Sequence, residues 1–206
     1  MTLEKKIILL STAYLPNLSV LSEVLSADEI YIEQHEYFVK QTHRNRCHIL
    51  TSNGKLTLSI PLVKSTEKDL ICHKRISYAE NWQQQHWRSI TSAYKSSPYF
   101  EFFEHEFRAF YSNQFDLLID YNTQLLKTVL HILRIKKEIK LTTEFVLHPI
   151  NSIDLREYDH SLLNTIHHST PYYQVFSDKL DFTPNLSCLD ALFNIGLETI
   201  DFCKLN

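Results

Sequence analysis

The chain has 206 residues, of which 44% are hydrophobic and 12% aromatic, and this composition excludes an intrinsically disordered protein. Its formal net charge is −3, so the overall charge provides no attraction to nucleic acid or to an anionic membrane surface. The length predicts a single domain, 1–206, although the part that follows about residue 146 could pack as a separate lobe.

The first apolar run lies in "MTLEKKIILLSTAYLP", directly after a pair of lysines. It is about five residues long, shorter than the ~7–15 apolar residues at the centre of a signal peptide. The run therefore predicts a first strand over 5–11. No window approaches the ~18 apolar residues of a membrane span, so we expect a cytoplasmic protein without one.

Further strands are indicated by runs of β-branched residues. In "CHILTSNGKLTLSIPL", Asn53 and Gly54 separate two such runs and predict a hairpin with strands at about 46–52 and 55–61. Similar runs predict strands at 29–34, 70–76 and 139–145. Gly54 and Gly196 are the only glycines, and each is expected where the backbone needs a positive φ.

Helical periodicity dominates the middle of the chain. Residues 82–97 predict a helix that ends before Pro98, and the segments 100–112 and 115–135 predict two more. Near the end, Ser187 is a candidate N-cap of a short helix that stops at Gly196. An early mixed sheet with a hairpin, a helical middle and a short β/α tail predict an α/β fold, with α+β as the alternative.

Two glycines exclude the dinucleotide-binding, Walker A and nucleophile-elbow motifs, because each of them needs several glycines close together. The four cysteines are widely separated and form no C-x-x-C pair, so we expect reduced, mostly buried thiols. The spacing matches no zinc module, so no metal site is assigned, and a structural metal stays an open alternative. No motif identifies a cofactor or an oligomeric state.

Donor side chains are densest in "EYFVKQTHRNRCHI", where Lys40, His43, Arg44 and Arg46 precede or enter a strand. Such a set suits a phosphate or carboxylate group, and a solvated charged loop is the alternative. Nucleic-acid binding would rest on this short loop alone, which the net negative charge argues against. Among the eleven histidines, His86 could orient a ligand or could serve only the packing of its helix on the sheet.

The succession of motifs resembles the WbqC-like family of bacterial proteins. The matching features are "YLP", "AD", "Y…RNR", a hairpin that ends in "LSIPL", "W…HW…I…AYKSSPYF" and "LSCLDALFNIG". Members of this family occur in surface-polysaccharide (O-antigen) gene clusters. A role in attaching an acyl or amino-acyl group to a sugar amine has been proposed for them. The resemblance carries over to Tyr14, Asp28, Tyr37, Asn45, Arg46, His86 and Tyr94.

One departure from the family concerns its opening motif. Members typically carry His-Gln-Pro before Y-L-P, whereas this chain has Leu10, Ser11 and Thr12 there. If the histidine is the family's general base, this chain lacks it.

Two hypotheses follow. In the first, the protein is an acyl or aminoacyl transferase whose small-molecule substrate is a sugar nucleotide or an acyl donor. Arg44 and Arg46 would then hold an anionic group, and His86 or His35 would accept the proton of the attacking amine. In the second, the protein is a catalytically silent relative that serves as a binding or scaffolding protein.

Overall fold

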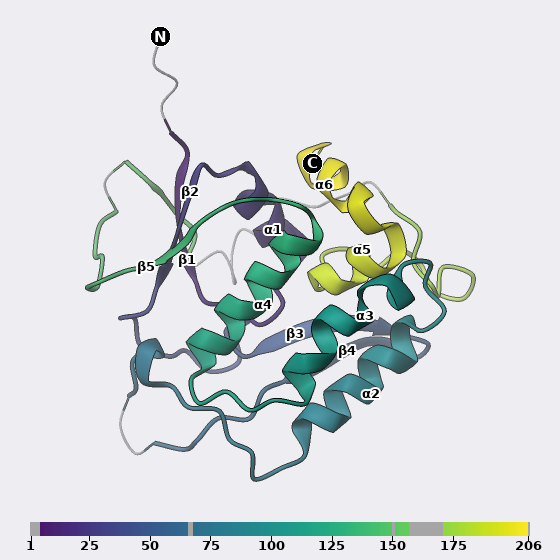
Figure 1. Ribbon diagram of the computed structural model, residues 1–206, viewed down its shortest axis with the longest axis horizontal. Coiled ribbons are helices and arrows are strands. Elements are labelled where there is room, and N and C mark those ends of the chain that lie inside the picture. Colours follow the sequence, from purple (N-terminus) through teal and green to yellow (C-terminus); the bar gives the residue numbers. More distant parts are fainter. Residues whose placement is uncertain (1–4, 66–67, 150, 157–170, 206) are drawn as a thin grey trace.

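Figure 1 shows the computed structural model, which describes residues 5–65, 68–149, 151–156 and 171–205. A parallel sheet lies on one side of the molecule, an antiparallel hairpin lies near the middle, and most of the helices lie on the other side. The fold is therefore mixed α/β, as the sequence predicts.

The parallel sheet has the strand order β5-β2-β1-β6. Its strands are β1 (Ile7–Ser11), β2 (Glu29–Glu33), β5 (Ile139–Leu141) and β6 (Ile153–Asp154). Helix α1 (Leu18–Ser26) connects β1 to β2, and the side chain of its N-cap, Asn17, accepts a hydrogen bond from the Val20 amide. Because all four strands run in the same direction, their carboxyl ends meet at one edge of the sheet.

The predicted hairpin is confirmed as β3 (Arg46–Thr51) paired with β4 (Gly54–Ser59) in a separate two-stranded sheet. Gly54 has φ of +99°, the left-handed region that the Asn-Gly signal anticipates. Arg46 lies opposite Ser59, so the donor-rich connection leads directly into the first hairpin strand.

The predicted helices are confirmed, with small shifts of their ends. They are α2 (Trp82–Tyr94), α3 (Phe100–Arg108), α4 (Leu118–Ile132) and α5 (Cys188–Ile195), and α6 (Thr199–Leu205) follows at the end of the chain. Short 3₁₀ turns occur at η1 (Ile71–His73), η2 (Ala109–Tyr111) and η3 (Gly196–Glu198). Ser187 caps α5, and Gly196 ends it with φ of +59°.

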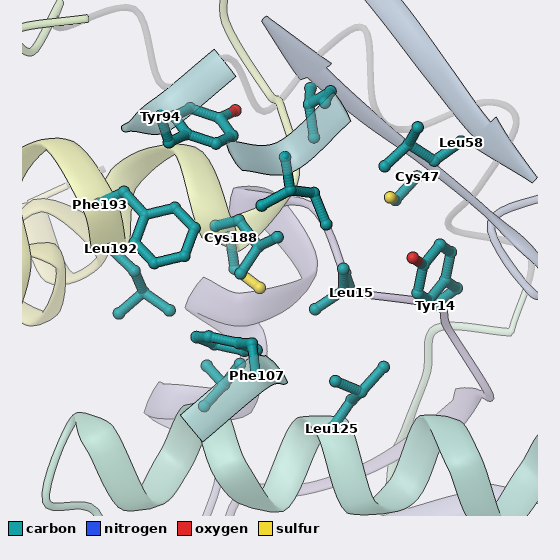
Figure 2. Close-up of a cluster of buried hydrophobic side chains, with 14 of the residues drawn as sticks. Tyr14, Leu15, Cys47, Leu58, Tyr94, Phe107, Leu125, Cys188, Leu192 and Phe193 are labelled. Atoms are coloured by element: carbon teal, nitrogen blue, oxygen red, sulfur yellow. The ribbon is translucent and has the colours of Figure 1, made fainter. Parts of the chain in front are cut away.

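Two hydrophobic clusters hold these layers together. One lies between the parallel sheet and helices α1 and α4, with Ile8, Ile30, Val24 and Leu126 among its members. The larger one joins the hairpin, α2, α3, α4 and α5. Figure 2 shows part of it, with side chains from separate elements converging around Leu15. Burying one large apolar side chain stabilises a fold by ~1.5–3 kcal/mol, so these clusters fix the position of the hairpin relative to the sheet.

Two strand predictions need correction. Residues 70–76 form no strand: the amides of Ile71 and Cys72 donate to the carbonyls of Glu36 and Gln34, and the chain then turns through η1. Pairing with the 34–36 segment thus satisfies this backbone for only two residues before the turn. The predicted strand 139–145 is shorter, because pairing with β2 ends at Leu141. The predicted thiol state is confirmed, with all four cysteines free and three of them buried.

Candidate functional site

Two surface pockets adjoin the segment 37–39, which runs from β2 toward the hairpin. The first, here called the basic groove, has a volume of about 1140 Å³ and lies between residues 37–41, the start of β3, the end of β4 and residues 60–65. The second, here called the edge pocket, has a volume of about 1030 Å³ and lies at the carboxyl edge of the parallel sheet. Tyr37 and Val39 line both pockets.

Cationic side chains outnumber anionic ones in the basic groove. Its cations are Lys40, Arg46, Lys64, Lys68 and Lys74, and its carboxylates are Asp69 and Glu80. The Lys74 ammonium donates to Asp69 Oδ2 at 2.7 Å, and this bond lowers the pKa of the Asp69 carboxyl group. Because that pair is neutral as a unit, the remaining groups give the groove a positive potential.

Arg46 and Asn45 bring unused hydrogen-bonding capacity to the basic groove. Arg46 Nε is buried and has no hydrogen-bond partner among the described residues, and the same holds for Asn45 Oδ1. The Asn45 amide nitrogen is occupied, since it donates to the Ile60 carbonyl at 2.8 Å. Buried polar groups are nearly always paired, so an unpaired guanidinium nitrogen in a positive groove favours an anionic ligand.

Arg44 differs from Arg46, because its guanidinium is already engaged. Nε and Nη2 donate to the two carboxylate oxygens of Glu36 at 3.0 and 2.9 Å. Nη2 also donates to Ser11 Oγ at 2.7 Å, and Nη1 donates to Thr42 Oγ1 at 3.3 Å. Arg44 borders the edge pocket, but its contacts join the end of β1 to the donor-rich connection.

Tyr14 and His86 lie together in the core. The Tyr14 hydroxyl is 3.0 Å from His86 Nδ1 and 2.8 Å from the Tyr111 hydroxyl. Burial lowers the pKa of His86 to about 4, so the imidazole is neutral near pH 7. His86 is 6% exposed and is hydrogen-bonded to the backbone of Ser59, which lines the basic groove.

Tyr94 and Asp28 lie away from both pockets. The Tyr94 hydroxyl donates to Asp190 Oδ1 at 2.9 Å inside the core, where burial raises the pKa of Asp190. Asp28 is exposed at the amino end of β2, where its Oδ2 accepts the Lys6 amide at 2.8 Å. The structure thus brings Tyr37, Asn45 and Arg46 together in the basic groove, and His35, Tyr37 and Arg44 in the edge pocket.

Sequence reasoning missed several residues of these pockets. Asp154 and Arg156 line the edge pocket, and their side chains pair through two short contacts. Lys64, Lys68 and Lys74 complete the basic groove. The available signal was positional, because ligands of open parallel sheets bind outside the carboxyl ends of the strands.

Within the described ranges, no group of three or more His, Cys, Asp or Glu side chains is arranged to hold a metal ion. The same residues contain no helix with the length and apolar character needed to cross a membrane.

Comparison with known proteins confirms the resemblance in the sequence. The profile of the WbqC-like protein family matches residues 12–157. The "Uncharacterized protein Rv1507c" of Mycobacterium tuberculosis is 22% identical over 226 residues, which cover 97% of this chain and 98% of that protein. No solved structure gives a significant match. Because the family profile covers well over half of its length, the chain belongs to the WbqC-like protein family.

Proposed function

We propose that the basic groove binds the phosphate groups of a sugar nucleotide and that the protein acts in the cytoplasm in bacterial surface-polysaccharide assembly. The reaction we assign is acyl or aminoacyl transfer to the amine of the sugar. The observation that carries this proposal is the buried, unpartnered Nε of Arg46 in a groove rich in cations. Guanidinium groups bind phosphate through short, charge-assisted hydrogen bonds.

Neighbouring side chains support the same ligand class. The exposed Tyr37 ring offers a flat surface for a base or sugar ring, and the Lys68 ammonium lies 5.9 Å from its centre. Asn45 Oδ1 offers a free acceptor to a ligand hydroxyl. A cationic end and an aromatic wall suit a phosphate joined to rings.

In the proposed transfer, the sugar amine attacks the carbonyl carbon of an acyl thioester or ester. A C–N bond forms, the bond to the leaving group breaks, and the amine gives up a proton. His35 is the better placed of the two candidate histidines to accept it, because His35 lines a pocket whereas His86 is buried behind β4. We therefore assign His86 to orienting Tyr14 rather than to proton transfer.

The first test is a calorimetric titration of the wild type and Arg46→Ala with a uridine diphosphate sugar. Loss of charge-assisted hydrogen bonds costs ~1.5–3 kcal/mol, so we expect affinity to fall about 10- to 150-fold. Arg108→Ala is the matched control, because Arg108 is exposed at the end of α3 and lines neither pocket. Equal affinity of the wild type and Arg46→Ala would refute the role of Arg46.

A catalytically silent relative that binds the ligand or serves as a scaffold is the second candidate. The observation that favours it is Leu10, which stands where the family carries histidine and is 3% exposed in the core. Mass spectrometry after incubation with an amino-sugar nucleotide and acyl thioesters separates the two. Binding without any acylated product would favour the silent relative, and product formation that His35→Ala abolishes would favour the transferase.

A further inference from the structure

The edge pocket lies where parallel α/β sheets bind their ligands, outside the carboxyl ends of the strands. In Figure 1 the chain enters β1 from the N-terminus at the top, so these ends face the lower part of the picture. Ser11, Glu33 and Asp154 end β1, β2 and β6 at this edge. The pocket at this edge is far larger than packing defects between side chains, so it has room for a small molecule.

Both guanidinium groups of this edge are committed to partners. Arg44 forms the two-pronged pair with Glu36 described above. Arg156 forms a similar pair with Asp154, at 2.9 Å from Nε to Oδ1 and 2.6 Å from Nη2 to Oδ2, and its Nη1 donates to the Val146 carbonyl. Each pair is neutral as a unit, and neither guanidinium keeps its donors free for an anionic ligand.

Glu33 adds a third carboxylate to the two pairs. Its side chain is fully buried and accepts hydrogen bonds from the His35 amide, the Thr142 hydroxyl and the Val146 amide. These donors are neutral, and the nearest cation is Arg156 Nη1 at 3.8 Å, which Asp154 already shares. Glu36 and Asp154 line the edge pocket together with Arg44 and Arg156, and the Glu33 carboxylate lies behind them, 3.8 Å from Arg156 Nη1.

The carboxylates give the edge pocket free hydrogen-bond acceptors. The carboxylates of Glu36 and Asp154 keep unused lone pairs beside their arginine contacts. His35 Nε2 is buried against the pocket without a hydrogen-bond partner among the described residues. Free carboxylate acceptors favour a positively charged donor, because such hydrogen bonds are charge-assisted.

Apolar side chains form the walls of the edge pocket. Tyr37, Val39, Phe145 and Leu147 are 58%, 47%, 49% and 66% exposed and all line it. Large apolar side chains gathered around a polar floor are typical of a site for an organic ligand. The ligand should therefore combine a cationic group with a ring that can lie against Tyr37 or Phe145.

We propose that the edge pocket binds a primary ammonium group carried on a sugar ring, with Glu36 and Asp154 as its acceptors. The identity of the ring rests on the proposed function, whereas the preference for an ammonium ion rests on the carboxylate acceptors of the edge alone. Because Tyr37 and Val39 line both pockets, one amino-sugar nucleotide would place its phosphates in the basic groove and its amine in the edge pocket.

The test compares three probes by calorimetry near neutral pH: uridine diphosphate glucosamine, its N-acetylated form and uridine diphosphate alone. N-acetylation removes the charge and keeps the rest of the ligand, so we expect it to weaken binding about 10-fold or more. Asp154→Asn should abolish this preference. Asp28→Asn is the matched control, because Asp28 also accepts a backbone amide but lies at the amino end of β2.

The outcomes distinguish the ammonium site of the edge pocket from the phosphate site of the basic groove. If uridine diphosphate binds through Arg46 but the amino and N-acetyl forms bind equally, the ammonium site is refuted and the phosphate site stands. If Asp154→Asn is unfolded in a thermal melt, the wild-type comparison of the two sugar nucleotides still decides. If no nucleotide binds, free glucosamine is titrated against N-acetylglucosamine: a preference for glucosamine keeps the ammonium site alone, and equal or absent binding refutes both.

Discussion

We expect different roles for Arg44 and Arg46: Arg44 stabilises the fold, and Arg46 binds the ligand. The substitution Arg44→Ala tests the role of Arg44 in stability. The Arg44 side chain is 7% exposed and that of Glu36 is 11% exposed, so the pair is almost fully removed from water. Removing one partner of such a pair leaves a buried charge without compensation, which costs ~3–5 kcal/mol. For a chain of this length that cost lowers the melting temperature by about 6–20 °C.

Urea unfolding followed by tryptophan fluorescence measures this cost. The matched control is Arg75→Ala, because Arg75 pairs with Asp116 at 2.7 Å while both side chains are more than half exposed. An exposed pair contributes ~0–1 kcal/mol. A double substitution, Arg44→Met with Glu36→Leu, should recover much of the lost stability, because no charge is then left buried.

If Arg44→Ala destabilised the protein no more than Arg75→Ala does, the reasoning would be refuted, and Arg44 would return as a candidate for anion binding. The contrast with Arg46→Ala sharpens the test. Arg46 makes no ion pair among the described contacts, so its removal should weaken ligand binding with little effect on the free energy of unfolding.

Two further predictions concern stability. Burial lowers the pKa of His86 in the folded state to about 4, so the unfolded chain takes up this proton first as the pH falls. The free energy of unfolding should therefore decrease by about 3 kcal/mol between pH ~6.5 and pH 4. The free energy of unfolding of His86→Gln should depend less steeply on pH in this range, and an unchanged slope would count against the buried neutral imidazole. Gly196→Ala should lower the melting temperature more than Gly54→Ala. Both glycines have positive φ, but a Cβ at 196 would lie 2.8 Å from the Tyr99 ring, whereas a Cβ at 54 would meet nothing within 4 Å. Equal shifts of the melting temperature in calorimetry would contradict this ordering.

Local signals account for the parts of the fold that the sequence predicts well. Asn53-Gly54 defines the hairpin because its turn needs positive φ, and Ser187 defines the start of α5 because its side chain caps the helix. The segment 70–76 misled prediction because its β-branched residues are buried singly, Ile71 and Ile76 in different clusters, while the backbone turns between them. Burial of this kind depends on tertiary neighbours that periodicity does not show.

In the candidate site, as in the fold, some residues can be predicted from local sequence signals and others depend on tertiary contacts. Arg46 was singled out as one of four donors in a short connection that leads into a predicted strand, and Asn45 through the family resemblance. Nothing in "RNR" distinguishes the two arginines, since the difference is whether Glu36 is folded back onto the guanidinium. The edge pocket was missed because it joins residues that follow β2 with Asp154 of β6, and the parallel strand order brings these ends together.

The Y-L-P loop has a positional role in this chain. Leu15 is buried with φ of +46°, a conformation that costs a non-glycine residue ~1–3 kcal/mol unless its surroundings hold it. Here they do: the Tyr14 amide donates to the His43 carbonyl, and the Pro16 carbonyl accepts the Cys188 amide. The loop thus fixes the connection before β3 and the start of α5 against the end of β1.

The end of β1, beside this loop, also supports the carboxyl edge of the parallel sheet. Ser11 Oγ accepts from Arg44 and donates to the Arg156 carbonyl, so the end of β1 supports the edge through hydroxyl contacts. Leu10 faces the hydrophobic cluster, and the cavities beside it measure only about 10 and 30 Å³, too small for any ligand beyond a water molecule. His35, which follows the end of β2, lines the edge pocket and is the imidazole that we propose as the proton acceptor.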